Sequence, residues 1–239
     1  MPTEDLAPFL TPGRYVDSDH PAVIAFARRV AGDATTARAV AVRLFHAVRD
    51  DIRYDPYRID LEPEGLTASR CLTQGFGFCV PKAALYAATL RVHGIPARLC
   101  FADVKNHLTS ERLRRTMGTD LFVYHGYAEV LLPQAADAEP GAGLGTARWF
   151  KATPTFNRSL CERAGTLPLE FDGTADSIFH AFDATGRRHM EYVRDHGAYA
   201  DLPREAMLAA WDAVYPPNAE WKRGTSGGDF EADVQRVSA

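Results

Sequence analysis

A glycine-rich turn that runs directly into an alanine-rich apolar segment is the strongest structural constraint in this sequence. The turn covers residues 75–78, and the apolar segment after it contains several good helix formers: Ala83, Ala84, Ala87, Ala88 and Leu90. Pro81 suits the first turn of a helix, and Gly94 followed by Pro96 ends it. The sequence therefore predicts a helix over residues 80–93, with Cys79 at its start.

Cys79 lies where backbone N–H groups and the positive end of the helix dipole favour a thiolate over a thiol. Because these conditions are typical of a nucleophilic cysteine, we predict that Cys79 is a nucleophile. The alternative is that Cys79, like most cysteines, is a small core residue. That structural interpretation is preferred for Cys71, Cys100 and Cys161, which lie in or beside apolar runs.

The overall composition indicates a globular protein with one core. The chain has 239 residues, of which 46% are hydrophobic, and a formal net charge of -4. The simplest interpretation is one domain over residues 1–215, followed by a flexible tail over residues 216–239. No basic stripe indicates a nucleic-acid or membrane-surface partner, and no apolar run approaches the roughly 20 residues of a membrane span.

Cysteine usage and the first residues indicate the cellular compartment. The four cysteines contain no C-x-x-C pair, which argues against a disulfide scaffold and a structural zinc site. The first residues, Met1–Leu6, lack the basic region and apolar core of a signal peptide. We therefore expect a cytoplasmic protein with no cofactor and no bound metal.

Hydrophobic periodicity predicts helices in the first part of the chain and strands in the middle. Thr35 or Thr36 can cap a helix in which Val40, Leu44 and Val48 have helical spacing. The strongest strand signal, rich in aromatic and β-branched residues, covers residues 122–132. Further helices are expected at 21–30, 67–72 and 203–214, further strands at 97–104 and 148–153, and irregular structure after residue 157. This order predicts an α+β fold in which the nucleophile helix packs on an antiparallel sheet.

His125 lies within the strongest strand, where alternation places it on the same face as Tyr127 and Glu129. A strand histidine is often only structural, but a nucleophile and its base need to be close in space rather than in sequence. We therefore predict that His125 is the general base for Cys79. The expected hairpin register, in which paired residue numbers sum to about 278, places Thr153 opposite His125.

Several other polar residues are weaker candidates for roles in the site. Gln74 and the backbone N–H of Cys79 are candidate oxyanion donors, although a turn residue is the more common role for Gln74. Three residues are candidates for contacts with a substrate: Asn106, His107 and Tyr127. Three histidines lie in an acidic stretch whose spacing matches no metal signature: His180, His189 and His196.

Three ordered motifs over residues 35–157 resemble the transglutaminase-like superfamily. The first is Gly77-Phe78-Cys79, which begins an alanine-rich helix that ends in Gly94-Ile95-Pro96-Ala97-Arg98. The second is the strand motif His125-Gly126-Tyr127-Ala128-Glu129-Val130, and the third is Trp149-Phe150-Lys151-Ala152-Thr153-Pro154-Thr155. The resemblance implies a papain-like α+β fold with a Cys–His–Asp triad, in which Cys79 and His125 are the nucleophile and the base.

The family's aspartate position is occupied by Thr153 in this sequence. A threonine can accept a hydrogen bond from the imidazole, but it has no charge to stabilise an imidazolium. Asn157 is the alternative orienter, because an asparagine has this role in papain-like enzymes. Asp103 and Asp120 are remoter alternatives.

The resemblance implies a thiol acyl-transfer enzyme, similar to bacterial transglutaminase-like cysteine proteases. Cys79 would attack an amide or ester of a peptide, a protein or a small molecule and form a thioester. Resolution by water would give a protease or amidase, and resolution by an amine would give a transglutaminase. Two alternatives stay open: a binding or structural protein with an unused cysteine, and a metal-dependent hydrolase that uses the histidines of the C-terminal half. The oligomeric state also stays open.

Overall fold

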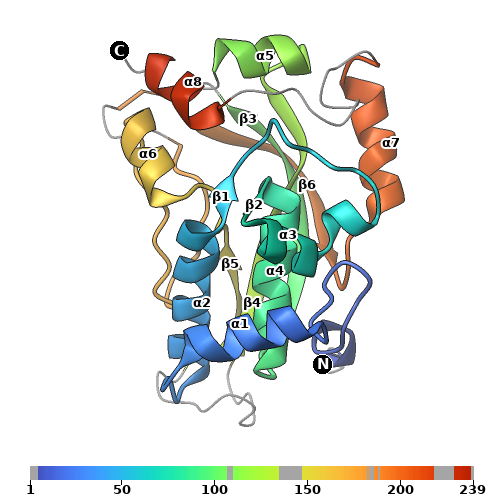
Figure 1. The fold of residues 1–239 in the computed structure, drawn as a ribbon, viewed down its shortest axis with the longest axis vertical. Coiled ribbons are helices and arrows are strands. Elements are labelled where there is room, and N and C mark those ends of the chain that lie inside the picture. Colours follow the sequence, from blue (N-terminus) through green and yellow to red (C-terminus); the bar gives the residue numbers. More distant parts are fainter. Residues whose placement is uncertain are drawn as a thin grey trace.

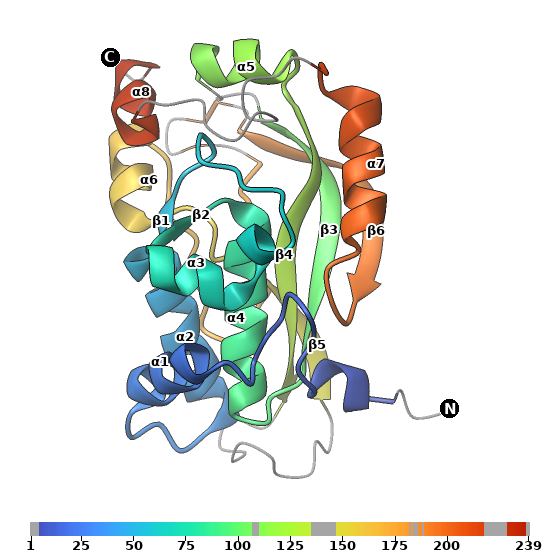
Figure 2. The same ribbon diagram turned by 45° about the vertical axis from the view of Figure 1, so that its right-hand side comes forward.

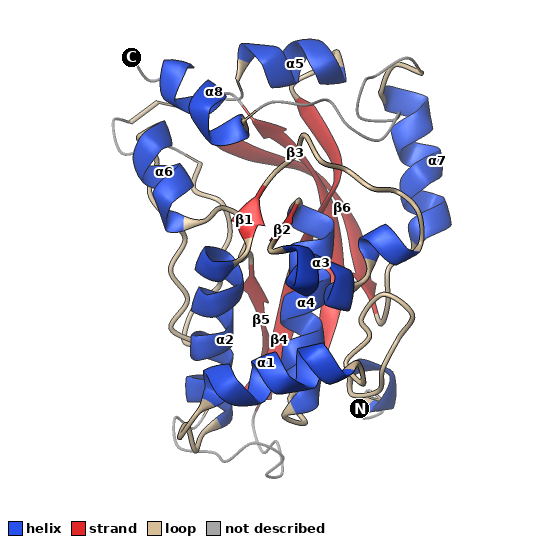
Figure 3. Ribbon diagram, viewed as in Figure 1, coloured by secondary structure: helices blue, strands red, loops and turns tan. Residues whose placement is uncertain are grey.

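The chain folds into a layer of helices packed on one face of an antiparallel sheet (Figures 1 and 3). The computed structural model describes residues 5–106, 110–134, 147–181, 183, 186–187, 189–217 and 229–237. This arrangement confirms the α+β fold expected from the sequence. No helix in these ranges is long and apolar enough to cross a membrane.

The secondary structure follows the order of helices first and strands in the middle of the chain. The helices are α1 (Pro21–Ala31), α2 (Ala37–Asp51), α3 (Ala68–Gln74), α4 (Cys79–Val92), α5 (Glu111–Met117), α6 (Arg158–Ala164), α7 (Arg204–Val214) and α8 (Phe230–Val237), with short turns η1 (Ala7–Phe9) and η2 (Glu64–Leu66). The strands are β1 (Arg53–Tyr54), β2 (Phe76–Gly77), β3 (Ala97–Asn106), β4 (Leu121–Pro133), β5 (Ala147–Ala152) and β6 (Met190–Tyr199).

The main sheet has the strand order β5-β4-β3-β6, and all its neighbouring strands are antiparallel. Between β4 and β5, Ala128 lies opposite Ala152 and Val130 lies opposite Phe150. The predicted register, with Thr153 opposite His125, is therefore wrong by two residues. Alternation along a strand determines its faces but not the centre of a long connection, so the sequence could not set this register.

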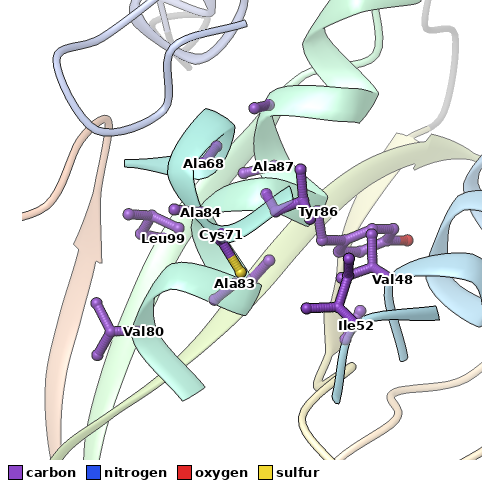
Figure 4. Close-up of a cluster of buried hydrophobic side chains, with 14 of the residues drawn as sticks. Val48, Ile52, Ala68, Cys71, Val80, Ala83, Ala84, Tyr86, Ala87 and Leu99 are labelled. Atoms are coloured by element: carbon purple, nitrogen blue, oxygen red, sulfur yellow. The ribbon is translucent and has the colours of Figure 1, made fainter. Parts of the chain in front are cut away.

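Helix α4 is the central element, because it packs against α1, α2 and α3 on one side and β4 on the other (Figure 2). Every residue from Val80 to Arg91 is buried. Figure 4 shows why this is possible: small side chains such as Ala83, Ala84 and Ala87 face the surrounding elements and allow close packing. At the start of α4, a Cβ on Gly126 would lie 3.0 Å from the Cα of Val80, so β4 needs glycine there.

Two charged side chains of α4 lie inside the core and were not predicted. Lys82 is fully buried, and its Nζ donates to the carbonyl oxygens of Arg49, at 3.0 Å, and of Ile52, at the C-terminal end of α2. A positive charge at that end is favoured by the helix dipole. Burial nevertheless lowers the pKa of Lys82 to about 7. Arg91 similarly donates to the carbonyl oxygens of Thr11 and Ala97, at 2.8 Å each.

The last part of the chain differs most from the prediction. Residues 158–202 were expected to be irregular, but they include α6 and β6, whereas the helix predicted over 203–214 forms as α7. The flexible tail predicted over residues 216–239 is wrong for residues 230–237, which form α8; residues 218–228 and 238–239 lie outside the described ranges.

Helix α8 returns to the rest of the domain beside α6 and near α5 (Figures 1 and 2). Asp233 accepts hydrogen bonds from Tyr57, at 3.0 Å, and Arg112, at 3.1 Å. The ring of Phe230 packs edge-on against Tyr54 and Tyr57, with centroids 5.6 and 5.4 Å away. These contacts anchor the helix, and no local pattern in the sequence indicates them.

Candidate active site

Cys79 begins α4, directly after the turn made by α3, Gly75 and β2. Gly75 ends α3 in the left-handed conformation, and Phe78 precedes α4 without a side-chain hydrogen bond to its first turn. The first N–H groups of α4 therefore stay available near the cysteine. Cys79 is partly exposed, whereas the other three cysteines are buried, which is the distribution expected from the sequence.

One apolar pocket brings Cys79 and His125 together. Its cavity volume is about 50 Å³, enough for a narrow group. The other lining residues are mostly aromatic or aliphatic and come from β1 and the loop after it, the turn before α4, α5, β4, α7 and the C-cap of α7: Tyr54, Pro56, Ile59, Phe78, Leu113, Met117, Phe122, Val123, Trp211 and Tyr215. The pocket therefore holds the Cys79 thiol and the His125 imidazole in mostly apolar surroundings.

The apolar surroundings determine the protonation of both residues. Burial raises the pKa of Cys79 to about 11, although hydrogen bonding from the backbone amides of Gly126, Val80 and Cys79 acts in the opposite direction. Burial also lowers the pKa of His125 to about 3. These pKa values favour a thiol and a neutral imidazole at neutral pH in the free protein, against the thiolate expected from the sequence, because desolvation outweighs the N–H groups at the helix start.

The imidazole of His125 is packed rather than hydrogen-bonded. Its Nε2 is buried without a partner among the described residues. The ring lies against Phe179, with centroids 4.8 Å apart, and Phe179 stacks in turn on Phe156 at 4.9 Å. No hydrogen bond joins His125 to Cys79 within the described ranges. Cys79 and His125 therefore share one pocket without a hydrogen bond between them, and Nε2 of His125 is unpaired among the described residues.

Thr153, the predicted orienter, is completely buried, and its Oγ1 has no hydrogen-bond partner in the described part of the chain. The Tyr192 hydroxyl lies near enough for the Thr153 side chain to affect its pKa, although the two groups make no hydrogen bond of ordinary geometry. Burial raises the pKa of Tyr192 to about 12, and the Phe179 amide and the Thr153 side chain act in the lowering direction. Thr153 and His125 are thus two buried polar groups, each with an unused hydrogen-bonding atom.

The alternative orienters are occupied elsewhere. Asn157 accepts from the backbone N–H of Tyr54 at 3.1 Å and donates to Ser159 and Glu231 at 2.7 and 3.1 Å. The carboxylate of Asp103 lies 2.6 Å from Nε2 of His196, and that of Asp120 lies 3.6 Å from Nζ of Lys105. The described contacts thus bring none of these three side chains to His125.

Of the weaker candidates whose side chains the structure describes, only Asn106 lines a pocket together with His125. Gln74 donates from Nε2 to the carbonyl oxygen of Phe76 at 2.8 Å, so its amide braces the turn before α4. Tyr127 is buried in a small cluster with Cys100 and Ala102 and does not line the pocket of Cys79. Asn106 lines a second, adjoining pocket that contains His125 and Phe230.

Two further predictions concern His107 and the C-terminal histidines. His107 lies outside the described residues. Within the described residues, no group of three or more His, Cys, Asp or Glu side chains is arranged to hold a metal ion. His196 is paired with Asp103 instead.

Sequence reasoning missed the aromatic residues that close the pocket. Tyr54, Trp211 and Tyr215 all line it, and the indole of Trp211 donates to the carbonyl oxygen of Val123 at 2.7 Å. Burial raises the pKa of Tyr54 well above its usual value, and the nearby Cys79 adds to this shift. The i, i+4 spacing of Met207, Trp211 and Tyr215 marks a buried face of α7, but it does not say what that face covers.

A cysteine at a helix start, a strand histidine beside it and an antiparallel sheet behind them define the papain-like class of α+β proteins. The sequence profile of the transglutaminase-like superfamily matches residues 24–154. This match covers more than half of the chain, which therefore belongs to the transglutaminase-like superfamily.

The other comparisons give more distant similarity. None of the curated proteins matches this sequence. Among solved structures, the chain is similar to a crystal structure described as a candidate cysteine protease from Cytophaga hutchinsonii, at 17% sequence identity and a TM-score of 0.46. The similarity covers 82% of this chain and 55% of that one, so the chain spans about half the length of that protein.

Proposed function

We propose that this protein is a thiol acyl-transfer enzyme, with Cys79 as the nucleophile and His125 as the general base. The observation that carries the proposal is that both residues line the same mostly apolar pocket at the start of α4. Cys79 is also the one partly exposed cysteine of the chain. The substrate class is an amide or ester with a narrow apolar acyl group, because the pocket is small and mostly apolar.

In the proposed reaction, proton transfer accompanies attack, because the free site holds a thiol and a neutral imidazole. Sγ of Cys79 forms a bond to the substrate carbonyl carbon while the imidazole of His125 takes the thiol proton. The backbone N–H groups at the start of α4 stabilise the oxyanion in this proposal. His125 then gives the proton to the leaving amine or alcohol as its bond to carbon breaks, which leaves a thioester on Cys79.

The thioester is resolved by a second nucleophile. Water, deprotonated by His125, releases a carboxylic acid and restores the thiol; a primary amine releases an amide by the same route. Hydrolysis defines a protease or amidase, and amine transfer defines a transglutaminase. The dry lining of the pocket favours an amine that brings its own apolar group over bulk water.

Intact-protein mass spectrometry with p-nitrophenyl esters of short acyl chains tests the proposal. We expect one acyl group on Cys79, found by peptide mapping, and its release as an amide when a primary amine is added. Cys79→Ser should lose the adduct, and the matched variant Cys161→Ser should keep it, because Cys161 is buried outside the pocket. An unmodified Cys79, or acylation of another residue, would refute the proposed nucleophile.

A binding or structural role is the second candidate. Two observations favour it: Thr153 is uncharged, and no hydrogen bond joins Cys79 to His125 in the described part of the chain. Under this alternative the pocket would bind the esters reversibly and produce no covalent adduct. The same mass measurement therefore separates the two functions.

Thr153→Val and Asn157→Ala are expected to have opposite effects. Thr153→Val removes a hydroxyl that has no hydrogen-bond partner among the described residues, so the free energy of unfolding should change by less than about 0.5 kcal/mol. The acylation rate should fall about tenfold, because we expect that hydroxyl to orient His125 during the reaction. Asn157→Ala should instead lower stability by about 2 kcal/mol, because Asn157 makes three hydrogen bonds. Its acylation rate per folded molecule should be unchanged.

Chemical denaturation and single-turnover acylation measure these two quantities. Equal acylation rates for wild type and Thr153→Val would exclude Thr153 as the orienter. A slow but stable Asn157→Ala variant would transfer that role to Asn157.

A further inference from the structure

The backbone of β4 is irregular immediately before His125. Ala102 of β3 lies opposite His125, and Val104 lies opposite Phe122. Two residues of β4, Val123 and Tyr124, therefore lie opposite a single residue of β3, which is a β-bulge. Tyr124 has a φ of 55°, the one positive value for a residue other than glycine in the described part of the chain.

Side chains from α7 hold the first residue of the bulge. The N–H of Val123 donates to the hydroxyl of Tyr215 at 2.7 Å. The indole N–H of Trp211 donates to the carbonyl oxygen of Val123, also at 2.7 Å. Both backbone groups of Val123 are thus bonded by side chains, which compensates for their place outside the regular ladder.

An aspartate–histidine pair holds the second residue of the bulge. The N–H of Tyr124 donates to Oδ1 of Asp103 at 3.0 Å, and the same oxygen lies 2.6 Å from Nε2 of His196. The imidazole of His196 also stacks on the ring of Tyr124, with centroids 4.0 Å apart and planes 22° from parallel. The pair therefore contacts both the backbone and the side chain of the strained residue.

This pair lies outside the pocket that contains Cys79 and His125, because neither Asp103 nor His196 lines it. His196 is itself an extra residue of β6, because Phe101 lies opposite Gly197 and Ala102 opposite Asp195. Irregular strands from both sides of β3 thus meet at Asp103, one residue from the partner of His125.

We propose that Asp103 and His196 are positioning residues, which stabilise the bulge at Tyr124 and thereby place the imidazole of His125 for its reaction with Cys79. The inference rests on the proposed function, because the proposed function assigns His125 as the general base that Asp103 and His196 position. A bulge can direct one side chain out of the regular alternation, and strained residues often lie beside reacting groups. Here the strained residue directly precedes His125 in the chain.

Two substitutions at Tyr124 isolate the backbone conformation. Asparagine accepts a positive φ, whereas β-branched valine does not, and both remove the tyrosine ring. We expect Tyr124→Asn to acylate Cys79 within about threefold of the wild-type rate and Tyr124→Val to be about 10²-fold slower, with KM unchanged for both. Equal rates for the two variants would overturn the proposal.

Two substitutions at Asp103 test the pair itself. Asp103→Asn keeps an oxygen that can accept from the Tyr124 N–H, and Asp103→Ala does not. We expect the asparagine variant to retain most of the acylation rate and the alanine variant to behave like Tyr124→Val. Val193→Ala is the matched control, because Val193 is an exposed residue of the same strand as His196. An alanine variant of Asp103 as fast as this control would refute the role of the pair.

Carbon-13 NMR of labelled histidine makes the test independent of activity. The His125 signal should not titrate between pH 7 and 4 in the wild type, since burial lowers its pKa to about 3. In Tyr124→Val and Asp103→Ala the signal should shift and its titration should move towards the ordinary value of about 6.5. An unchanged signal in folded variants refutes the positioning role. Absence of acylation in the wild type, with these shifts present, refutes the proposed function alone.

Discussion

The rate at which iodoacetamide alkylates Cys79 is expected to rise about 10³-fold between pH 6 and pH 9. Only the thiolate reacts, and burial raises the pKa of Cys79 to about 11. Below that pKa the thiolate fraction increases tenfold for each pH unit, so the logarithm of the rate should rise with a slope of one. A preformed thiolate–imidazolium pair would instead react at a constant rate from about pH 6 upwards.

Mass-spectrometric mapping of the alkylated peptide against pH measures this profile. Cys161 is the internal control: its pKa is also raised to about 11 by burial, but the residue is buried and should react more slowly at every pH. His125→Ala should leave the profile unchanged, because no described hydrogen bond joins the imidazole to the thiol in the free protein. A plateau in the wild type that disappears in His125→Ala would show an ion pair and contradict this prediction.

Replacing Lys82 with methionine is expected to lower the free energy of unfolding by about 3 kcal/mol. Methionine matches the length of the lysine stem but cannot donate to the carbonyl oxygens of Arg49 and Ile52. These oxygens would lose their buried donor at the end of α2, and removal of the buried charge offsets only part of that loss. For a domain of this size, the melting temperature should fall by about 6–12 °C.

Thermal and denaturant unfolding measure the effect, with Lys105→Met as the matched control. Lys105 is partly exposed and lies 3.6 Å from Asp120, so its replacement should change stability by less than about 0.5 kcal/mol. Acylation per folded molecule should be unchanged in Lys82→Met, since Lys82 does not line the pocket of Cys79. A Lys82→Met protein as stable as the Lys105→Met control would show that the buried ammonium contributes no net stability.

The sequence predicted the parts of the site that depend on local patterns. The glycine turn and alanine-rich segment located the start of α4, and strand alternation located His125 on β4. Both elements form where predicted, because their residues are consistent with the local structure and with the core. Cys79 and His125 are 46 residues apart in the sequence, but this distance did not prevent the prediction, because each residue was located from the pattern of its own helix or strand.

The protonation of the site could not be predicted, because it depends on residues distant in the chain. The start of α4 alone favours a thiolate, but Trp211 and Tyr215 of α7 and Leu113 of α5 help to close the pocket and exclude water. The strand β6 was missed for a related reason: it is largely exposed and contains irregular pairs, so it shows no clean alternation. The desolvation of the site and the pairing of β6 thus both depend on the tertiary structure and not on local sequence patterns.

We expect helix α8 to make the pocket around His125 sensitive to ionic strength. Its Phe230 forms part of the wall around His125, yet its anchors include ion pairs near the surface: Asp233 with Arg112 at 3.1 Å and Glu231 with Arg163 at 3.7 Å. Salt screens such pairs over a Debye length of about 8 Å at 0.15 M. We therefore expect acylation rates measured in buffers of different salt content to combine the proposed reaction at Cys79 with a change in how firmly this helix is held.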